Sequence, residues 1–477
     1  MVILKNRPTV PAQNKWLIFL LVAVAQFMVV LDVSITNVAL PSIKTSLHFA
    51  SDSDLQWVIT AYALTFGGFL LMGGRAADLF GRRRTLLIGM SCFTFFSLLI
   101  GFSQNASLLI ALRALQGLAA ALMSPAALSI VLATFSEGKG RNRALAYWAT
   151  IATGGAALGL LLGGMLTQFL GWQWNFFINV PVGIMMVLAI LYAVPRYESE
   201  SEHSDLDLSG ASLVTTGLIA FVFAISRAPY IGWLAPQSLG VFILSALLLA
   251  GFIWNESMSK HPLVPLSIFS IQNVTGANLV MAPIYGCILG MFFIATLYMQ
   301  TTLHYSPIAT GFAFLPFPIV LGIVSSNVPR FVEKYGYKLF LVLGPVLVAV
   351  AIAWFVRLPL SGNYFFDVLP TLLLMPAGMG MTFMPIITAA TSGVAPDENG
   401  LASGLITTSQ QMGGAIGLAI LSGIASAASM AGSPAATLIG YRESFAIAAM
   451  FALFAAFIGF MVIKQRRTRR EIRAFAQ

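Results

Sequence analysis

The sequence predicts an all-α membrane protein with fourteen spanning helices, and two observations lead to this prediction. The chain of 477 residues is 58% hydrophobic and only 9% charged, with a mean hydropathy of +0.87. A soluble fold buries so large an apolar fraction only with difficulty. The apolar residues also form long runs, each close to the roughly 20 residues with which a helix crosses a bilayer. Helices are expected because lipid offers no hydrogen-bond partner to an exposed backbone group.

Charge placement supports the count of fourteen and predicts an orientation. When the connections between spans are assigned to alternate sides, 21 of the 26 Lys and Arg residues fall on the side of the N-terminus and four on the other. Because Lys and Arg collect in cytoplasmic loops, we expect a multi-pass protein of the cytoplasmic (inner) membrane with both termini in the cytoplasm. The predicted spans are residues 17–40, 55–74, 85–103, 107–133, 144–168, 176–194, 209–226, 237–254, 276–300, 308–328, 339–356, 368–391, 401–428 and 444–463.

The net charge of +9 follows from the same rule and from attraction to anionic lipid. The bilayer is therefore an expected partner and nucleic acid is not, although the basic segment 464–473 could bind nucleic acid in principle. The sequence contains no GxxxxGK[ST] nucleotide loop, and its four histidines show no metal-ligand spacing. With no catalytic cluster visible, we expect neither an enzyme nor a bound metal or cofactor.

Two full charges fall inside the predicted spans, Asp32 in the first and Arg113 in the fourth. An ionisable group in hydrocarbon costs several kcal/mol, so each is a functional candidate. A helical rise of 1.5 Å per residue places Asp32 about 12 Å and Arg113 about 9 Å below the same membrane face. If the two helices are neighbours, the acid lies between the opposing effects of desolvation and a nearby cation, and it can exchange a proton. A static pair that locks two helices is the alternative.

The chain also contains a repeat that predicts two related halves. Residues 74–83 follow the second span and residues 329–338 follow the tenth; in both, an acid precedes a glycine by three residues and a base follows that glycine by two. The halves predicted from this repeat are an N-terminal six-helix bundle (1–194) and a C-terminal six-helix bundle (261–477), joined by a linker and an inserted helix pair (195–260). Parallel halves with a binding site between them are a transporter architecture.

Several segments, taken together and in order, resemble the major facilitator superfamily, in particular its fourteen-span drug:proton antiporter branch. The resemblance covers nearly the whole chain and implies two six-helix bundles plus an inserted pair, with export of small amphipathic compounds in exchange for protons. It rests on residues 31–41 in the first span, Gln56-Trp57 with Thr60-Ala61-Tyr62 in the second, the GxxxDxxGRR-like loop 74–83, the RxxQG motif 113–117, residues 172–181 and residues 400–414.

The resemblance gives roles to particular residues. Asp32 and Arg113 are the expected proton-coupling pair. The loop residues Gly74, Asp78, Gly81, Arg82 and Arg83 are expected to latch the cytoplasmic helix ends in one conformational state; the alternative is that the arginines only obey the positive-inside rule. The glycine-rich run of the fifth span has Leu160 where this branch usually has proline, and its glycines serve either close packing or gating.

Substrate contacts are predicted from side-chain chemistry. Flexible thioethers and aromatic rings suit loosely specified apolar ligands, and amides can hydrogen-bond a substrate. The candidates for the substrate pocket are Gln56, Tyr62, Gln116, Met291, Tyr298 and Gln410. The expected function is proton-coupled efflux of small amphipathic compounds or drugs, with a facilitator or exporter of one specific metabolite as the alternative. Substrate, protons and lipid are the expected partners; accessory periplasmic export proteins are a further partner that the sequence leaves open.

Overall fold

The computed structural model describes residues 12–135, 138–195, 207–259, 262–395, 398–429 and 433–465, and these residues are almost entirely helical. The basic tail beyond residue 465 and most of the acidic linker between the sixth and seventh spans lie outside the described residues. The helices are α1 (Ala12–Ser46), α2 (Asp52–Leu55), α3 (Trp57–Phe80), α4 (Arg82–Gly101), α5 (Ala106–Thr134), α6 (Lys139–Phe169), α7 (Trp174–Phe177), α8 (Asn179–Ala193), α9 (Leu208–Ile231), α10 (Pro236–Met258), η1 (Leu266–Ser270), α11 (Gln272–Leu297), η2 (Tyr298–Thr302), α12 (Pro307–Phe314), α13 (Pro316–Tyr335), α14 (Tyr337–Phe355), η3 (Tyr364–Val368), α15 (Leu369–Thr391), α16 (Asn399–Ser429) and α17 (Pro434–Met461).

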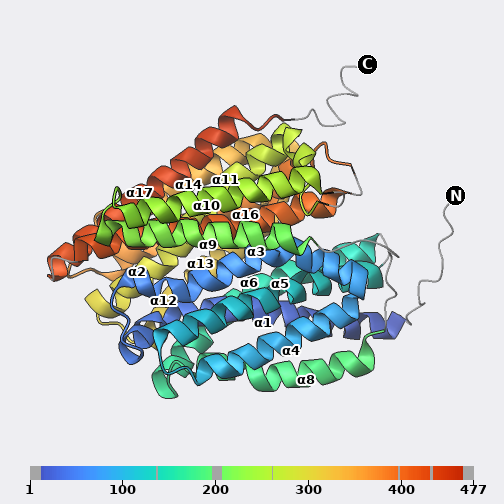
Figure 1. Ribbon diagram of the computed structural model, residues 1–477, viewed down its shortest axis with the longest axis horizontal. Helices are drawn as coiled ribbons and strands as arrows, with labels where there is room; N and C mark the ends of the chain where they lie inside the picture. The colour runs from blue at the N-terminus through green and yellow to red at the C-terminus, as the bar shows by residue number, and fades with distance from the viewer. Residues whose placement is uncertain are drawn as a thin grey trace.

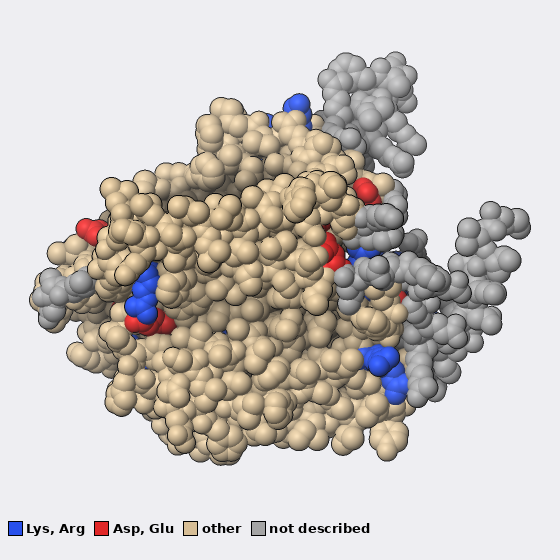
Figure 2. Space-filling view, viewed as in Figure 1, with Lys and Arg blue, Asp and Glu red and all other residues tan. Residues whose placement is uncertain are grey.

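These helices confirm the predicted membrane architecture. Among the described residues, thirteen helices are long and apolar enough to cross a membrane, and Gly154–Phe169 within α6 is a shorter apolar helix. Each of the fourteen predicted spans falls on one of them. Figure 2 shows the corresponding surface: charged side chains on this face lie towards its two ends, and a broad uncharged band separates them. A protein surface that faces the hydrocarbon core of a bilayer is expected to have such an uncharged band.

The predicted ends of the spans are wrong where a charged residue lies within a helix. The prediction ends one span at residue 254, but α10 continues to Met258 and buries Glu256. It begins the last span at residue 444, but α17 begins at Pro434 and includes Arg442, whose Nε donates to the carbonyl of Leu358 at 2.8 Å. A charged side chain near a helix end is tolerated when a partner satisfies it, and hydropathy alone does not reveal that partner.

Two groups of helices lie side by side in Figure 1, with α1–α8 in blue to teal and α11–α17 in yellow-green to red. They meet mainly through α3 against α16 and α6 against α12 and α13. The pair α9–α10 lies outside both groups: α9 packs against α3 and α16, whereas α10 packs mainly against α9. The inserted pair therefore covers the α3–α16 seam. The division into domains at residues 194 and 260 remains a prediction.

The predicted repeat has a matching backbone geometry. Gly81 joins α3 to α4 with φ of 90°, and Gly336 joins α13 to α14 with φ of 79°. Both values lie in the left-handed region, which glycine adopts without a steric penalty. A sharp joint without intervening loop residues therefore needs glycine at both positions, which explains the repeated glycine of the two motifs.

The end of the molecule where α1 finishes, at Ser46, is called the distal end, and the opposite end the proximal end. Among the described residues, three hydrogen bonds join the two groups of helices near the distal end. Gln300 Nε2 donates to the Val38 carbonyl at 2.9 Å, and the Ser53 amide donates to Ser426 Oγ at 2.8 Å. The Ile308 amide donates to an oxygen of Gln168 at 3.3 Å. The distal end is thus closed in this conformation.

Candidate functional site

The two intramembrane charges form a buried ion pair. Asp32 on α1 is fully buried and Arg113 on α5 is 1% exposed. Nη1 of Arg113 lies 2.5 Å from Oδ2 of Asp32. Pairing offsets part of the cost of removing each charge from water, and removal of either partner would leave a strongly destabilising unpaired charge. The two helices that carry these charges, α1 and α5, are therefore neighbours, as the predicted pairing requires.

Amide side chains complete the surroundings of the acid. Gln116 Nε2 donates to Oδ1 of Asp32 at 3.0 Å, and Asn179 Nδ2 donates to the same oxygen at 3.2 Å. Both amides also contact Ser97 Oγ, at 2.8 and 3.4 Å. All three residues are buried. Two amides and one guanidinium thus point at a single carboxylate, and hydrogen bonds of this charge-assisted kind are stronger than those between neutral groups.

The guanidinium of Arg113 is fixed by contacts on several sides. Its Nε donates to the Val58 carbonyl at 3.0 Å, and its Nη1 also donates to Gln116 Oε1 at 2.5 Å. Its central carbon lies 4.4 Å from the ring centroid of Tyr62 and 5.7 Å from that of Phe176. A cation over an aromatic face is stabilised by the ring quadrupole. Arg113 is therefore held in one orientation, between the acid and the ring of Tyr62.

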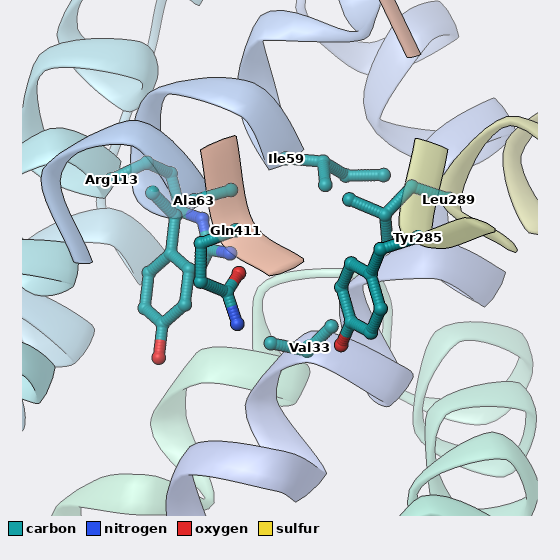
Figure 3. A pocket seen from close by; sticks show the side chains of 8 residues that line it. Val33, Ile59, Ala63, Arg113, Tyr285, Leu289 and Gln411 are labelled. Carbon is teal, nitrogen blue, oxygen red and sulfur yellow. The ribbon is translucent and has the colours of Figure 1, made fainter. Parts of the chain in front are cut away.

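A small cavity lies beside this pair and between the two groups of helices. Its volume is about 30 Å³, room for roughly two water molecules. Figure 3 shows Gln411 and Arg113 on one side of this space and Tyr285 on the other. Arg113 lines the cavity, whereas Asp32 does not, and the buried hydroxyl of Tyr62 has no hydrogen-bond partner. The lining residues are Val33, Ile59, Tyr62, Ala63, Arg113, Tyr285, Leu289 and Gln411.

The structure brings some of the predicted substrate residues together and separates others. Tyr62 lines the cavity, and Gln116 lies behind it, bonded to Asp32. Gln56 is buried just before α3, and its side-chain oxygen Oε1 accepts a hydrogen bond from the Thr60 hydroxyl. Met291 on α11 is fully buried in a core cluster to which both groups of helices contribute. Tyr298 lies in η2 and donates to the Pro359 carbonyl at 2.7 Å.

On α16, Gln410 is half-buried, and the neighbouring Gln411 lines the cavity. A choice between adjacent helix positions depends on helix rotation, which a sequence without strong amphipathicity leaves open. Sequence reasoning did not single out Ser97 or Tyr285, because a serine or tyrosine in an apolar span has a common packing role. Asn179 lies in residues 172–181, one of the segments that carry the family resemblance. That resemblance was the one sequence signal that could have pointed to Asn179.

The loop motif holds neighbouring helices within the N-terminal group. Arg83 donates to the Leu191 carbonyl at 2.5 Å, which links the start of α4 to the end of α8. Asp78 is exposed near the end of α3, and Arg82 is half-buried at the start of α4. A methyl group on Gly74 would make only ordinary contact with Pro125, whereas one on the preceding Gly73 would lie 2.0 Å from the Ala121 carbonyl oxygen. Gly73, rather than Gly74, therefore allows this part of α3 to approach α5 closely.

The glycine-rich face of α6 makes close contacts along its length. A methyl group on Gly159 would lie 2.6 Å from Cβ of Ser34, and one on Gly163 would lie 2.7 Å from Cα of Ile35, both on α1. One on Gly164 would lie 2.6 Å from the Pro307 carbonyl oxygen on α12. The helix is continuous through Leu160. These glycines therefore provide close packing both within the N-terminal group and across to the other group.

Comparisons with known proteins agree with this arrangement. The family model of the Major Facilitator Superfamily matches residues 22–418. The puromycin resistance protein pur8 of Streptomyces alboniger is 37% identical over 452 residues, which are 93% of this chain and 89% of the relative. The multidrug resistance protein Stp of Mycobacterium tuberculosis is 32% identical over 401 residues, 84% of this chain and 74% of the relative.

A solved structure shows the same fold at low sequence identity. The peptide transporter POT, determined as a point mutant in complex with sulfate, matches with a TM-score of 0.66 and 14% identity, covering 96% of this chain and 97% of that one. At that identity the likeness concerns the fold alone. The family match over most of the length, the similar relatives and the shared fold lead to one conclusion: this chain is a member of the Major Facilitator Superfamily.

Proposed function

We propose that this protein exports small amphipathic compounds, including drugs, across the cytoplasmic membrane in exchange for protons. The observation that carries the proposal is the buried Asp32–Arg113 pair beside a cavity between the two groups of helices. Relatives named for antibiotic and multidrug resistance support export as the direction. In this proposal the proximal end and both termini face the cytoplasm, and the distal end faces outward.

Coupling follows from the charge of the pair. With Asp32 ionised, the acid and Arg113 sum to zero, and the cavity can accept a cationic or neutral compound against the rings of Tyr62 and Tyr285. Protonation of Asp32 leaves Arg113 uncompensated, so the site acquires a charge of +1. A positive charge in a poorly solvated site disfavours a cation. Proton binding and cation binding therefore oppose each other, which is the condition for exchange rather than co-transport.

Alternating access is required by the geometry. The cavity of about 30 Å³ is far smaller than the roughly 300–1,000 Å³ of a typical small-molecule pocket. The halves must separate to admit substrate, and the contacts closing the distal end must break to release it. Within this proposal the residues Asp78, Arg82 and Arg83 form the proximal latch. Accessory periplasmic export proteins would act beyond the distal end.

The sign of the coupling gives a first test in reconstituted vesicles. Exchange of one proton for one monovalent cation moves no net charge, whereas exchange for a neutral compound moves one. We expect a pH gradient to drive export of both kinds of substrate, and an imposed membrane potential to change the rate for the neutral one only. Rates would be measured with a panel of neutral and cationic compounds. An equal response of both kinds to the potential would contradict the charge rule.

A second candidate is an exporter dedicated to one compound, since one of the similar relatives is named for resistance to a single antibiotic, puromycin. The same vesicles separate the two candidates. A broad competitor profile across chemically unrelated compounds supports the multidrug function. Inhibition by a single compound and its close analogues supports the dedicated exporter.

The distal closure offers a prediction with a matched control on the same helix. A methyl group on Gly164 would meet the Pro307 carbonyl oxygen at 2.6 Å, whereas one on Gly154 would meet nothing within 4 Å. We therefore expect Gly164→Ala to prevent tight closure of the distal end and to reduce export several-fold. Gly154→Ala should export at the wild-type rate. Reagent labelling of a cysteine placed at Val38, which is fully buried near the distal end, in a cysteine-free background, would measure the opening. Unchanged labelling in Gly164→Ala would contradict the prediction.

A further inference from the structure

A second buried acid lies far along the chain from the transport site, at the end of the inserted helix pair. Glu256 is near the C-terminal end of α10 and is only 3% exposed. Its Oε2 accepts a hydrogen bond from the Val264 amide at 2.9 Å, in the segment that leads into α11. Its Oε1 is also buried and has no donor. A buried carboxylate oxygen without a donor is expensive, so this orphaned atom needs an explanation.

The neighbouring acid, Asp207, has the opposite environment. It caps α9, and its Oδ1 accepts from the Gly210 amide and from Ser209 Oγ, each at 2.7 Å. Asn255 Nδ2 donates to Oδ1 at 3.1 Å and to Oδ2 at 2.8 Å. Burial opposes the charged form of Asp207, but these hydrogen bonds outweigh it and hold the pKa of Asp207 below its usual range. Asp207 is therefore the ionised member of the two.

The two carboxyl groups share one small space. A methyl group on Gly210 would lie 2.6 Å from Oε1 of Glu256 and 2.7 Å from Oδ2 of Asp207. Both oxygens therefore lie within 2.7 Å of one point, and the two carboxyl groups are close neighbours. Two carboxylates this close cannot both remain ionised at low cost, and a pair of this kind holds one proton between its members. A proton on Oε1 of Glu256 would give that atom its missing partner.

We propose that Glu256 carries this proton and donates it to Asp207, so that the carboxyl pair is a proton-binding site that fastens the inserted helices α9 and α10 to the segment entering α11. The site lies outside the cavity beside Arg113, and its proton is not a transported one. It joins three parts of the chain: α9 through Asp207, α10 through Glu256, and the α11 entry through the Val264 amide.

We call the carboxyl pair Asp207–Glu256, together with the Val264 amide, the clasp. The residues around it connect the clasp to both halves of the transporter. Arg75 on α3 donates to the Pro262 carbonyl at 3.1 Å, two residues before Val264. Apolar side chains of α3, α9, α16 and the α11 entry pack together here: Met72, Ala211, Leu263, Val264, Ala402 and Leu405. The other titratable or charged groups on the described parts of these elements are Tyr62 and Asp78 on α3, Arg227 and Tyr230 on α9, Tyr285 and Cys287 on α11, and Glu398 just before α16. A change at the pair therefore reaches the junction of α3, α11 and α16 at the proximal end.

The sign of the pH dependence follows from the chemistry. At low pH the proton is present, Glu256 is neutral, and both of its oxygens are satisfied. As the pH rises the proton leaves, and two negative charges then repel each other at close range. The clasp is thus closed at low pH and loosened at high pH. Because the proximal end faces the cytoplasm in the proposed orientation, cytoplasmic pH would adjust how firmly the inserted pair is held.

Infrared spectroscopy of the full-length protein in vesicles tests the protonation directly. We expect the wild type at neutral pH to show a protonated-carboxyl band that disappears as pH rises. Glu256→Gln should lack this band, whereas Glu443→Gln, which changes an exposed carboxylate on α17, should retain it. Asp207→Asn removes the neighbouring negative charge, so the band should disappear at a lower pH than in the wild type. A band at neutral pH that is unchanged in Glu256→Gln would overturn the proposal.

Amide hydrogen exchange tests the clasp independently of transport. The side-chain amide introduced by Glu256→Gln can donate to Asp207 while its carbonyl accepts from Val264, which imitates the protonated acid at every pH. After correction for intrinsic exchange rates, we expect wild-type peptides containing Val264 to lose protection at high pH at least several-fold, and Glu256→Gln to remain protected. Parallel loss of protection in both proteins would show that the pair does not hold this segment. Neither readout depends on substrate, so the outcome is separate from that of the proposed function.

Discussion

Asp32→Asn is expected to abolish proton-driven efflux while the protein remains folded, at reduced stability, because Arg113 keeps its contacts with the Val58 carbonyl, Gln116 and the ring of Tyr62. Asn keeps the size of the side chain and can still accept from Gln116 and Asn179, but it cannot bind or release a proton in the working pH range. The site is then fixed at a charge of +1 because Arg113 remains. Export driven by a pH gradient in vesicles should fall to background, and cationic compounds should bind more weakly than neutral ones.

The control for this prediction is Glu443→Gln, which removes an exposed carboxylate on α17 and should leave coupled export unchanged. Downhill equilibration of a neutral substrate separates loss of coupling from loss of the transport cycle. We expect Asp32→Asn to retain that downhill movement without any accompanying proton flux. Gradient-driven export at the wild-type rate in Asp32→Asn would remove Asp32 from the coupling mechanism.

Arg113→Gln is expected to have the largest effect on stability. The substitution leaves Asp32 fully buried without its cation, and it removes the stacking on Tyr62 and the hydrogen bond to the Val58 carbonyl. Breaking one side of a buried ion pair typically costs about 3–5 kcal/mol. Thermal unfolding of the purified protein in detergent should therefore occur at a clearly lower temperature than in the wild type.

A double variant identifies the source of that loss. Asp32→Asn combined with Arg113→Gln leaves no unpaired charge in the site, so it should recover a large part of the stability that Arg113→Gln alone loses. Arg84→Gln, at an exposed position on α4, should change the free energy of unfolding by no more than about 0.5 kcal/mol. Equal unfolding temperatures for the single and double variants would mean that packing, rather than the unpaired acid, accounts for the loss.

The membrane spans and the central ion pair could be predicted because their signals survive in the sequence. Hydrocarbon demands long apolar runs, and a charge inside such a run is rare enough to mark a site by itself. Asp32 and Arg113 are 81 residues apart, but similar depths on two spans were enough to predict that they could pair. The repeated glycine of the loop motif was also visible in the sequence, and the structure adds that Gly81 and Gly336 share a positive φ.

The remaining parts of the site depend on how the helices rotate and pack. Asn179 reaches Asp32 across 147 residues of sequence, and no spacing rule predicts that contact. Gln411 rather than Gln410 faces the cavity because of the rotation of α16, and in an apolar bundle little in the sequence fixes rotation. Glu256 was missed because its charge suggested the end of a span, while its partners, Asp207 and the Val264 amide, come from other segments.

The position of α9 and α10 makes the two sides of the transporter unequal towards lipid. On one side, α9 covers the seam between α3 and α16, and α10 covers α9. Where α6 meets α12 and α13, none of the described helices forms such a cover, and apolar side chains of α6 and α13 such as Leu158, Met165 and Ile319 are exposed. A lipid-soluble molecule that diffuses within one leaflet would therefore reach the seam between α6 and α12–α13 more readily than the seam between α3 and α16.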